Sequence, residues 1–208
     1  MPLQNRVTPS GDIIVSNYRG NWMGNRGGQL HRTDKSLTSR RWVTKSWICC
    51  RLKFKDRHRK IMAPGRYTEL FFLDEASAVA AGHRPCAECR RHHFTSFIHY
   101  WSLMIGESRR FYVKEIDTIL HQERIDRYRQ KNIFLTKIED LPSGCFIKYE
   151  DSPWLILNNH MLEWNPGGYL RKLPLKSGKS VQVLTPRSIV ALLNAGYPVE
   201  IHDSADQL

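Results

Sequence analysis

The sequence predicts an α+β protein in which a small module of strands and helices comes first, further helices follow, and a small antiparallel β-rich part comes last. Three observations lead to this order. Short strand-like runs and a capped helix surround a set of cysteines, aromatic residues then recur at helical spacing, and strand-like runs separated by turn residues fill the last third. With 208 residues, of which 41% are hydrophobic, the chain is long enough for one large domain or two small ones.

The first 40 residues predict loop structure with at most one strand, at residues 13–15. Within this segment, residues 20–31 read GNWMGNRGGQLH, and its glycines would let backbone amides approach a ligand. Asn25 and Arg26 could then hold a phosphate or contact the edge of a base. The segment lacks the Gly-Lys-Ser/Thr ending of a P-loop, and a flexible surface loop is the alternative interpretation.

Two strands and a short helix are predicted next. Residues 41–54, RWVTKSWICCRLKF, favour a strand because aromatic and β-branched residues dominate. The following KDRHRKIMAPGR, at residues 55–66, is a basic segment able to lie along phosphates. TELFF at residues 68–72 predicts the second strand. Asp74 is a good N-cap for a helix that Gly82 ends.

The cysteines carry the strongest chemical signal in the chain. One Cys-x-x-Cys pair opens a predicted helix, and two neighbouring cysteines lie upstream on the first predicted strand. Zinc prefers four sulfur or imidazole ligands, and a Cys-x-x-Cys pair supplies two of them from one tight turn. We therefore predict a structural Zn²⁺ site made by Cys49, Cys50, Cys86 and Cys89. A redox-active pair and unliganded thiols are the alternatives.

The stretch from TKSWICC through ELFFLDEASAVAAGHRPCAECRR, about residues 44–91, resembles the zinc-binding module of the Ada DNA methylphosphotriester repair family. That family combines an apolar strand with cysteine, a basic loop, an aromatic pair, and an A-E-A-x-A-A-G-[FY]-R-P-C-x-x-C helix and cysteine pair. The resemblance implies a DNA-binding zinc fold in which Cys86 and Cys89 are ligands and Cys49 is the methyl-accepting ligand. Lys53 stands where the family has its second upstream cysteine.

The fourth zinc ligand stays open at this point. Cys50 could supply it, although neighbouring residues on an extended strand point to opposite sides, so that a bulge or bend would be required. Otherwise His83, His92 or His93 would complete the site. The remaining cysteine, Cys145, is interpreted as a buried strand residue.

The rest of the chain predicts two helices and a sheet. Residues 90–105 predict a helix whose aromatic face packs in the core, and residues 115–131 predict a helix with a solvated, charged face. The last segment predicts a small antiparallel sheet closed by a helix with Thr185 as its N-cap. We therefore divide the chain into a basic, zinc-bearing part at residues 1–135 and a β-rich part at residues 136–208 that packs on it.

The charge is concentrated in one third of the chain. The 32 basic and 20 acidic residues give a net charge of +12, and residues 1–66 hold 15 of the basic residues but only three acidic ones. Such a concentration is typical of a surface that binds a polyanion. DNA is therefore the predicted partner, with RNA as an alternative. A membrane surface is disfavoured because no long amphipathic helix accompanies the basic residues, and no protein partner is predicted.

The predicted nucleic-acid contacts are basic or aromatic residues in and near this region. They are Arg26, His31, Arg51, Lys53, Lys55, Arg57, Arg59, Lys60, Arg66, Tyr67 and Arg84. The start of the chain lacks the order of a secretory signal, and no run is apolar enough for a membrane helix. A cytoplasmic protein with reduced cysteines is therefore expected.

Two features favour chemistry over simple binding. The chain is longer than a single DNA-binding zinc module requires, and its six tryptophans and eight tyrosines could stack on an extruded base. Glu69 lies next to the basic segment, where a carboxylate could activate water. A strand residue paired with an arginine is the alternative role of Glu69.

We therefore expect a zinc-stabilised DNA-binding hydrolase that excises damaged or modified bases, like a DNA glycosylase, with Glu69 and Asn25 as catalytic residues. The alternatives are a non-enzymatic DNA-binding regulator or repair accessory, a methylphosphotriester methyl acceptor, and a nuclease.

Overall fold

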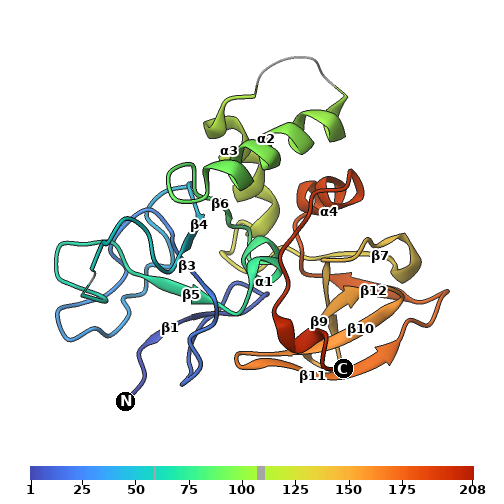
Figure 1. The fold of residues 1–208 in the computed structure, drawn as a ribbon, viewed down its shortest axis with the longest axis horizontal. Coiled ribbons are helices and arrows are strands. Elements are labelled where there is room, and N and C mark those ends of the chain that lie inside the picture. The colour runs from blue at the N-terminus through green and yellow to red at the C-terminus, as the bar shows by residue number, and fades with distance from the viewer. Residues whose placement is uncertain (59, 107–110) are drawn as a thin grey trace.

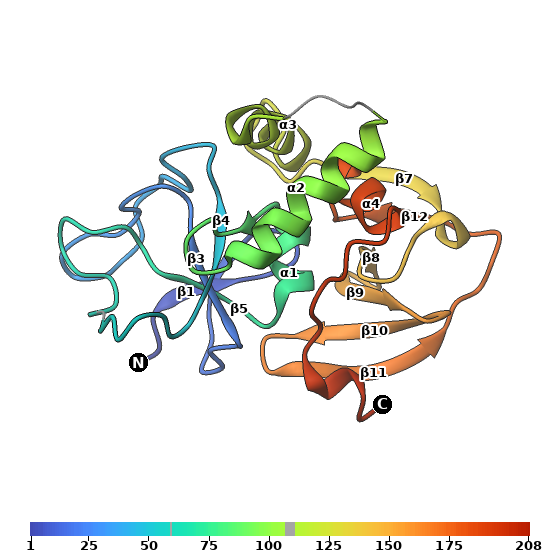
Figure 2. The same cartoon turned by 45° about the horizontal axis from the view of Figure 1, so that its top comes forward.

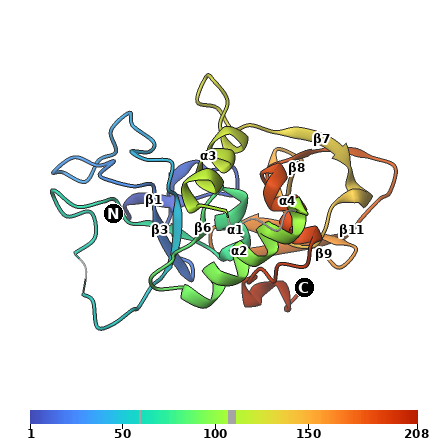
Figure 3. The same cartoon turned by 90° about the horizontal axis from the view of Figure 1, so that it is seen from above.

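The computed structural model describes residues 1–58, 60–106 and 111–208. It contains two six-stranded sheets with helices between them, so the predicted α+β class is confirmed (Figure 1). The first sheet has the order β2-β1-β5-β3-β4-β6 and the second the order β11-β10-β9-β8-β12-β7. Figures 2 and 3 show the helices in the middle of the molecule, with one sheet on each side.

The first sheet is mixed and comes from residues 1–85. Its strands are β1 (Gln4–Val7), β2 (Ile13–Val15), β3 (Trp22–Asn25), β4 (Ile48–Arg51), β5 (Leu70–Phe72) and β6 (Arg84–Pro85). Strand β3 is antiparallel to both β4 and β5, whereas β4 and β6 are parallel. The strand expected at residues 13–15 is present as β2, but the prediction of at most one strand in the first 40 residues is wrong, because β1 and β3 also lie there. Their strand character comes from long-range pairing, which local composition does not show.

Strand β3 also explains one of the glycines in the segment GNWMGNRGGQLH. A Cβ atom on Gly24 would lie 2.1 Å from the carbonyl oxygen of Ile48 on β4, so only glycine lets the two strands come this close. The predicted strand at residues 41–54 is shorter than expected and is limited to β4. Before it, the backbone amides of Val43 and Thr44 donate to the carbonyl of Arg26 and form a loop.

The short helix α1 (Glu75–Ala80) lies at the centre of the fold, and all of its residues are buried. Its predicted N-cap is confirmed, because the Asp74 carboxylate accepts from the amide of Ser77 at 2.8 Å. Asp74 also accepts from the hydroxyl of Tyr169 at 2.6 Å, which connects α1 to the second sheet. Gly82 follows with φ of 83°, as expected for a residue that ends a helix.

Helices α2 (Arg91–Ile105) and α3 (Val113–Arg124) follow. The aromatic face predicted for α2 lies in the core, where Phe97 and Trp101 are fully buried. The second helix ends before the predicted residue 131, because the Asp126 carboxylate accepts from the amides of Tyr128 and Gln130 and forms a turn instead.

The second sheet is antiparallel, as predicted. Its strands are β7 (Phe134–Lys137), β8 (Phe146–Tyr149), β9 (Ser152–Leu157), β10 (His160–Asn165), β11 (Gly168–Pro174) and β12 (Ser180–Val183). Helix α4 (Arg187–Asn194) packs beside it, and two short 3-10 helices lie at Ile138–Asp140 and Asp203–Ala205. Thr185 does not cap α4 as expected. Its hydroxyl accepts from the amide of Phe146 at 2.8 Å, and the cap position belongs to Pro186.

The two sheets have separate hydrophobic clusters, and helix α1 contributes residues to clusters of both sheets. One cluster combines Ala76 and Ala80 of α1 with Phe146, Leu155 and Leu162 of the second sheet. The largest cluster joins residues of α2 and α3 to the second sheet and α4. The boundary drawn at residue 135 falls within β7. Among the residues that the structure describes, no helix has the length and apolar character needed to cross a bilayer.

Candidate metal centre and basic surface

Three cysteines form a cluster that can hold a metal ion. The ligand atoms of Cys50, Cys86 and Cys89 all lie within 4.8 Å of one another. Cys50 is on β4, and the parallel pairing of β4 with β6 brings the Cys-x-x-Cys turn beside it. The amide of Cys86 donates to the carbonyl of Cys49 at 2.9 Å and completes this pairing.

Cys49 does not join the cluster, although it was among the predicted ligands. It is fully buried with Leu30, Leu70 and Phe72 on the other side of β4. Successive residues of a strand point to opposite faces, so one of two adjacent cysteines faces the metal site and the other faces the core. Burial raises the pKa of the Cys49 thiol, although the neighbouring charge of Arg90 opposes this shift. The structure therefore gives Cys49 the surroundings of a core residue.

The electrostatics of the cluster suit a cation. The backbone amides of Arg51 and Glu88 donate to the sulfurs of Cys89 and Cys86, each at 3.4 Å. Hydrogen bonds from the Cys50 and Cys89 thiols hold the pKa of Cys86 well below its usual range, and the contacts with Cys86 and Cys89 raise the pKa of Cys50. Sulfurs this close together repel one another as thiolates, and a bound divalent cation would remove that repulsion.

None of the histidines considered as a fourth ligand lies in this cluster of described residues. His83 is fully buried between aromatic rings, 5.1 Å from Trp47 and 4.7 Å from Phe72 between ring centroids. His92 is exposed on α2. His93 faces Glu200, with its Nε2 atom 3.3 Å from the carboxylate.

Glu75, His93 and Glu200 form a second group whose oxygen and nitrogen atoms lie close enough to bind a metal ion. The Arg90 guanidinium lies 2.9 Å from the Glu75 carboxylate in a completely buried ion pair. The hydroxyl of Tyr197 also donates to Glu75, at 2.8 Å. Because a cation already neutralises Glu75, this group is better explained as a buried ion-pair network than as a metal site.

The loop between β4 and β5, residues 52–69, is here called the basic loop. The exposed cations on it are Lys53, Lys55, Arg57, Lys60 and Arg66. Arg57 pairs with Glu88, which lies inside the Cys-x-x-Cys turn. Leu52 and Ile61 pack against the apolar cluster that contains Cys50 and Cys86. The three-cysteine cluster therefore lies at the base of the basic loop. A bound metal ion would hold the Cys-x-x-Cys turn and strand β4, from which the loop begins, together.

The predicted nucleic-acid contacts divide into exposed and buried residues. Arg51 is exposed like the loop cations, Tyr67 is half-buried, and Arg59 lies outside the described residues. Three others are buried, with exposed fractions of 2% for Arg26, 2% for His31 and 5% for Arg84. The interpretation of these three as surface contacts is not supported.

Each buried residue has an internal partner. The Arg84 guanidinium donates to both carboxylate oxygens of Asp117, at 2.7 and 2.9 Å. His31 Nδ1 lies 2.7 Å from the hydroxyl of Thr68, so this ring connects the N-terminal segment to the end of the basic loop. Arg26 stacks on Trp47, with 3.9 Å between its guanidinium carbon and the ring centroid.

The two residues expected to catalyse base excision are also buried. Glu69 is 3% exposed, and its carboxylate accepts from the amide of Met62 at 2.8 Å. Met62 has φ of 52°, so this hydrogen bond supports a tight turn of the basic loop. Asn25 is 9% exposed, and its side-chain oxygen accepts from the amide of Gly27 at 3.0 Å. Both side chains hold backbone in place.

Comparisons of the chain with protein-family models, with curated proteins and with solved structures found no match.

Proposed function

We propose that this protein binds nucleic acid, with DNA as the first partner, through the basic loop, and that a zinc ion bound by Cys50, Cys86 and Cys89 stabilises this surface. The observation that carries the proposal is the position of the three-cysteine cluster at the base of a loop whose described residues include five exposed cations. Zinc is the metal that such a sulfur ligand set favours, and a fourth position can be taken by water.

The arrangement supports binding by a simple electrostatic argument. Exposed lysine and arginine side chains on one loop neutralise phosphates and release the counterions condensed on a nucleic acid. The ion pair between Arg57 and Glu88 ties the loop to the turn that carries two of the sulfurs. Metal binding would therefore reduce the freedom of the loop before it meets the phosphate backbone.

The proposal contains no catalytic step. Glu69 and Asn25, the residues that base excision would use, are buried and bonded to backbone amides. Methyl transfer to Cys49 is not proposed either, because this thiol lies in the core and not beside the other sulfurs. The resemblance to the Ada zinc module supports DNA binding more directly than it supports either reaction.

The proposal is tested by measuring the anisotropy of a short labelled DNA duplex at several salt concentrations. Replacing Lys53 and Lys60 together by alanine should weaken binding by about tenfold and reduce the salt slope by roughly one unit per lost phosphate contact. The matched control replaces Lys172 and Lys176, which are exposed on and after β11, and changes the net charge equally. Equal losses for the two pairs, or no binding by the zinc-loaded protein, would contradict the proposal.

A further inference from the structure

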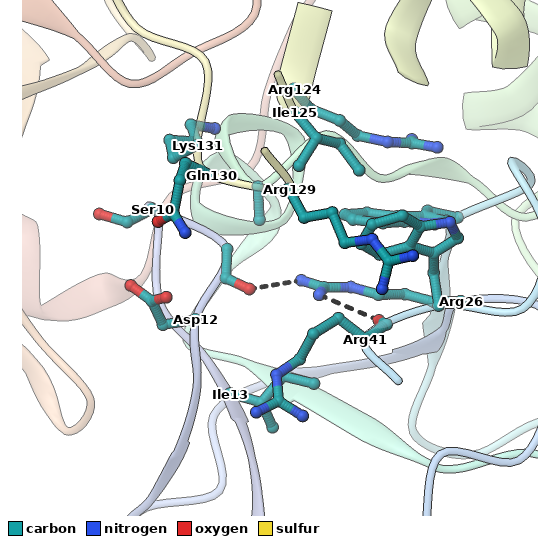
Figure 4. A pocket seen from close by; sticks show the side chains of 14 residues that line it. Ser10, Asp12, Ile13, Arg26, Arg41, Arg124, Ile125, Arg129, Gln130 and Lys131 are labelled. Atoms are coloured by element: carbon teal, nitrogen blue, oxygen red, sulfur yellow. Dashed lines mark hydrogen bonds between the residues drawn. The ribbon is translucent and has the colours of Figure 1, made fainter. Parts of the chain in front are cut away.

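A second basic region lies away from the metal cluster, in a pocket of about 300 Å³ (Figure 4). Segments far apart in the sequence contribute basic side chains to this cationic pocket, namely Arg26, Arg41, Arg124, Arg129 and Lys131. Asp12 is the acidic residue in its lining, and its side chain is exposed to solvent. The described walls of the pocket therefore carry a large excess of positive charge.

The deepest of these cations are bonded to neutral groups. Arg26 donates to the carbonyl of Gly11 at 2.7 Å, and the figure shows its guanidinium extending across the pocket. Arg124 donates to the carbonyls of Gly82 and Lys45, at 2.7 and 2.6 Å. These carbonyl acceptors satisfy N–H groups but carry no negative charge, and neither arginine forms an ion pair among the described residues.

The Lys131 ammonium has the same kind of partner. Its Nζ atom donates to the carbonyl of Ala80 at 2.7 Å. Ala80 is the last residue of α1, so this bond also satisfies a free carbonyl at the end of a helix. The bond explains the position of the ammonium, but the carbonyl carries no negative charge to balance it.

A comparison within the chain shows that this arrangement is unusual. Four arginines are buried in the described structure, and two of them have a carboxylate partner: Arg84 pairs with Asp117, and Arg90 pairs with Glu75. The other two are Arg26 and Arg124, and both line the cationic pocket. A buried charge without an ionic partner is costly, so a bound anion would stabilise the protein there.

The mutual effects of the pocket residues point the same way. Burial lowers the pKa of both Arg26 and Arg124. For Arg124 the repulsion of Arg26 adds to this shift and exceeds the attraction of Asp117. For Arg26 the attraction of Asp12 opposes the shift and exceeds the repulsion of Arg41. A guanidinium nevertheless stays charged near neutral pH. Both guanidinium carbons also lie within 4 Å of the Trp47 ring centroid, at 3.9 and 3.8 Å, so the two like charges are held in place.

We propose that the cationic pocket binds a phosphate monoester, the doubly charged end group of a free nucleotide or of a 5′-phosphorylated strand. Its volume is at the lower limit of small-ligand sites and suits an end group. Two negative charges and several acceptor oxygens match the clustered guanidinium donors better than a singly charged carboxylate would. None of the residues that line the pocket belongs to the basic loop or to the three-cysteine cluster.

The rim of the pocket allows a test that leaves the buried residues intact. Arg41 and Arg129 are exposed and line the pocket, so replacing both by alanine removes two donors without opening the core. Arg40 and Arg127 are exposed neighbours in the same two segments and do not line this pocket. Their double replacement by alanine is the matched control, because it changes the net charge by the same amount.

Adenosine 5′-monophosphate is titrated into each protein by calorimetry, with adenosine and inorganic phosphate as comparison ligands. The wild-type chain should bind the nucleotide at least about tenfold more tightly than adenosine, and inorganic phosphate should compete with it. The Arg41/Arg129 variant should lose at least about tenfold in affinity, whereas the control should stay within about twofold. Equal binding of adenosine and its monophosphate, or equal losses in the two variants, would overturn the proposal.

Two further measurements are needed. The first distinguishes a free nucleotide from a 5′-phosphorylated strand end as the ligand, and the second distinguishes failure of this proposal from failure of the proposed function. Tighter binding of a 5′-phosphorylated oligonucleotide than of its 5′-hydroxyl form supports a strand end as the natural ligand, and equal binding of both supports a free nucleotide. The Lys53/Lys60 variant should keep its affinity for the nucleotide. Absence of duplex binding by the zinc-loaded wild-type protein, together with retained nucleotide binding, would therefore contradict the proposed function alone.

Discussion

At the scale of single residues, two adjacent cysteines have opposite surroundings. Cys50 faces the other sulfurs of the metal cluster, whereas Cys49 is packed among the aliphatic and aromatic residues of the core. The alternation of side chains along β4 separates them. Identical residue types one position apart therefore have different chemical roles, and substitution of each should have a different effect.

Replacing Cys50 by alanine should abolish stoichiometric zinc binding, because the cluster would keep only the two sulfurs of the Cys-x-x-Cys turn. Replacing Cys49 by alanine should leave zinc content unchanged and cost about 1 kcal/mol of stability through lost packing. Zinc content is measured by atomic emission after exhaustive dialysis, and stability by urea unfolding. Retention of zinc by the Cys50 variant together with its loss from the Cys49 variant would show that the structure has assigned the two thiols to the wrong faces.

At the scale of secondary-structure elements, buried polar contacts determine how the helices meet the first sheet. The bidentate ion pair of Arg84 with Asp117 joins β6 to α3, and the hydroxyl of Ser46 donates to the same carboxylate at 2.5 Å. Because β6 precedes the Cys-x-x-Cys turn directly, this contact also positions the metal cluster. The helix α3 thus supports a site to which it contributes no ligand.

Replacing Arg84 by methionine should destabilise the protein by about 3–5 kcal/mol, because Asp117 would be left as an unpaired buried charge. Replacing Asp117 by leucine in the same chain should recover most of this loss, since no buried charge then remains. The free energies of unfolding of the two single variants and the double variant form a cycle that isolates the pair. Additive losses in the double variant would contradict this role of the ion pair.

At the scale of the whole molecule, the basic residues have two kinds of surroundings. Those on the basic loop are exposed, whereas three of those that line the cationic pocket, Arg26, Arg124 and Lys131, are partly or fully buried and donate to backbone carbonyls. The basic residues that give the net charge of +12 therefore do not form a single exposed surface. The buried share of this charge opposes folding, and it should make the stability of the protein depend on pH.

The free energy of unfolding should rise between about pH 7 and pH 10. Burial, followed by the charges of Arg26 and Arg124, lowers the pKa of Lys131 to about 7, with Asp12 acting in the opposite sense. An unfolded lysine has a pKa of about 10.4, so the unfolded chain binds more protons in this interval. Stability then increases with pH, by up to about 1.4 kcal/mol per pH unit for one group, and changes little from this cause below pH 7.

Urea unfolding of the zinc-loaded protein at several pH values measures this dependence. The Lys131→Met variant should be more stable than the wild type at pH 7 and should lack this part of the slope, because it carries no ammonium to bury. An identical slope in both proteins would show that Lys131 does not cause it.

Elements with strong local signals could be predicted. The cap at Asp74, the helix-ending Gly82 and the aromatic face of α2 all matched the structure, because each depends on residues within one or two helical turns. The early strands could not be predicted in this way. Each of them is three or four residues long, and β1 and β3 pair with β5, far along the chain.

Only part of the candidate site could be predicted from the sequence. Cys86 and Cys89 stood out because two ligands in one tight turn are a local pattern. The choice between Cys49 and Cys50 required the face of β4 that meets the turn. The catalytic interpretation of Glu69 depended on its nearness to basic residues in sequence, whereas its burial and its bond to Met62 are tertiary facts.

The sequence by itself determined the α+β class, the Cys-x-x-Cys turn and the excess of basic residues in the first third of the chain, since composition, spacing and local capping are all properties of neighbouring residues. Only the tertiary structure decided which cations meet solvent and which meet one another. Burial and charge compensation depend on contacts between segments such as β3, α3 and the turn after it, and these contacts brought Arg26, Arg124 and Lys131 into one pocket.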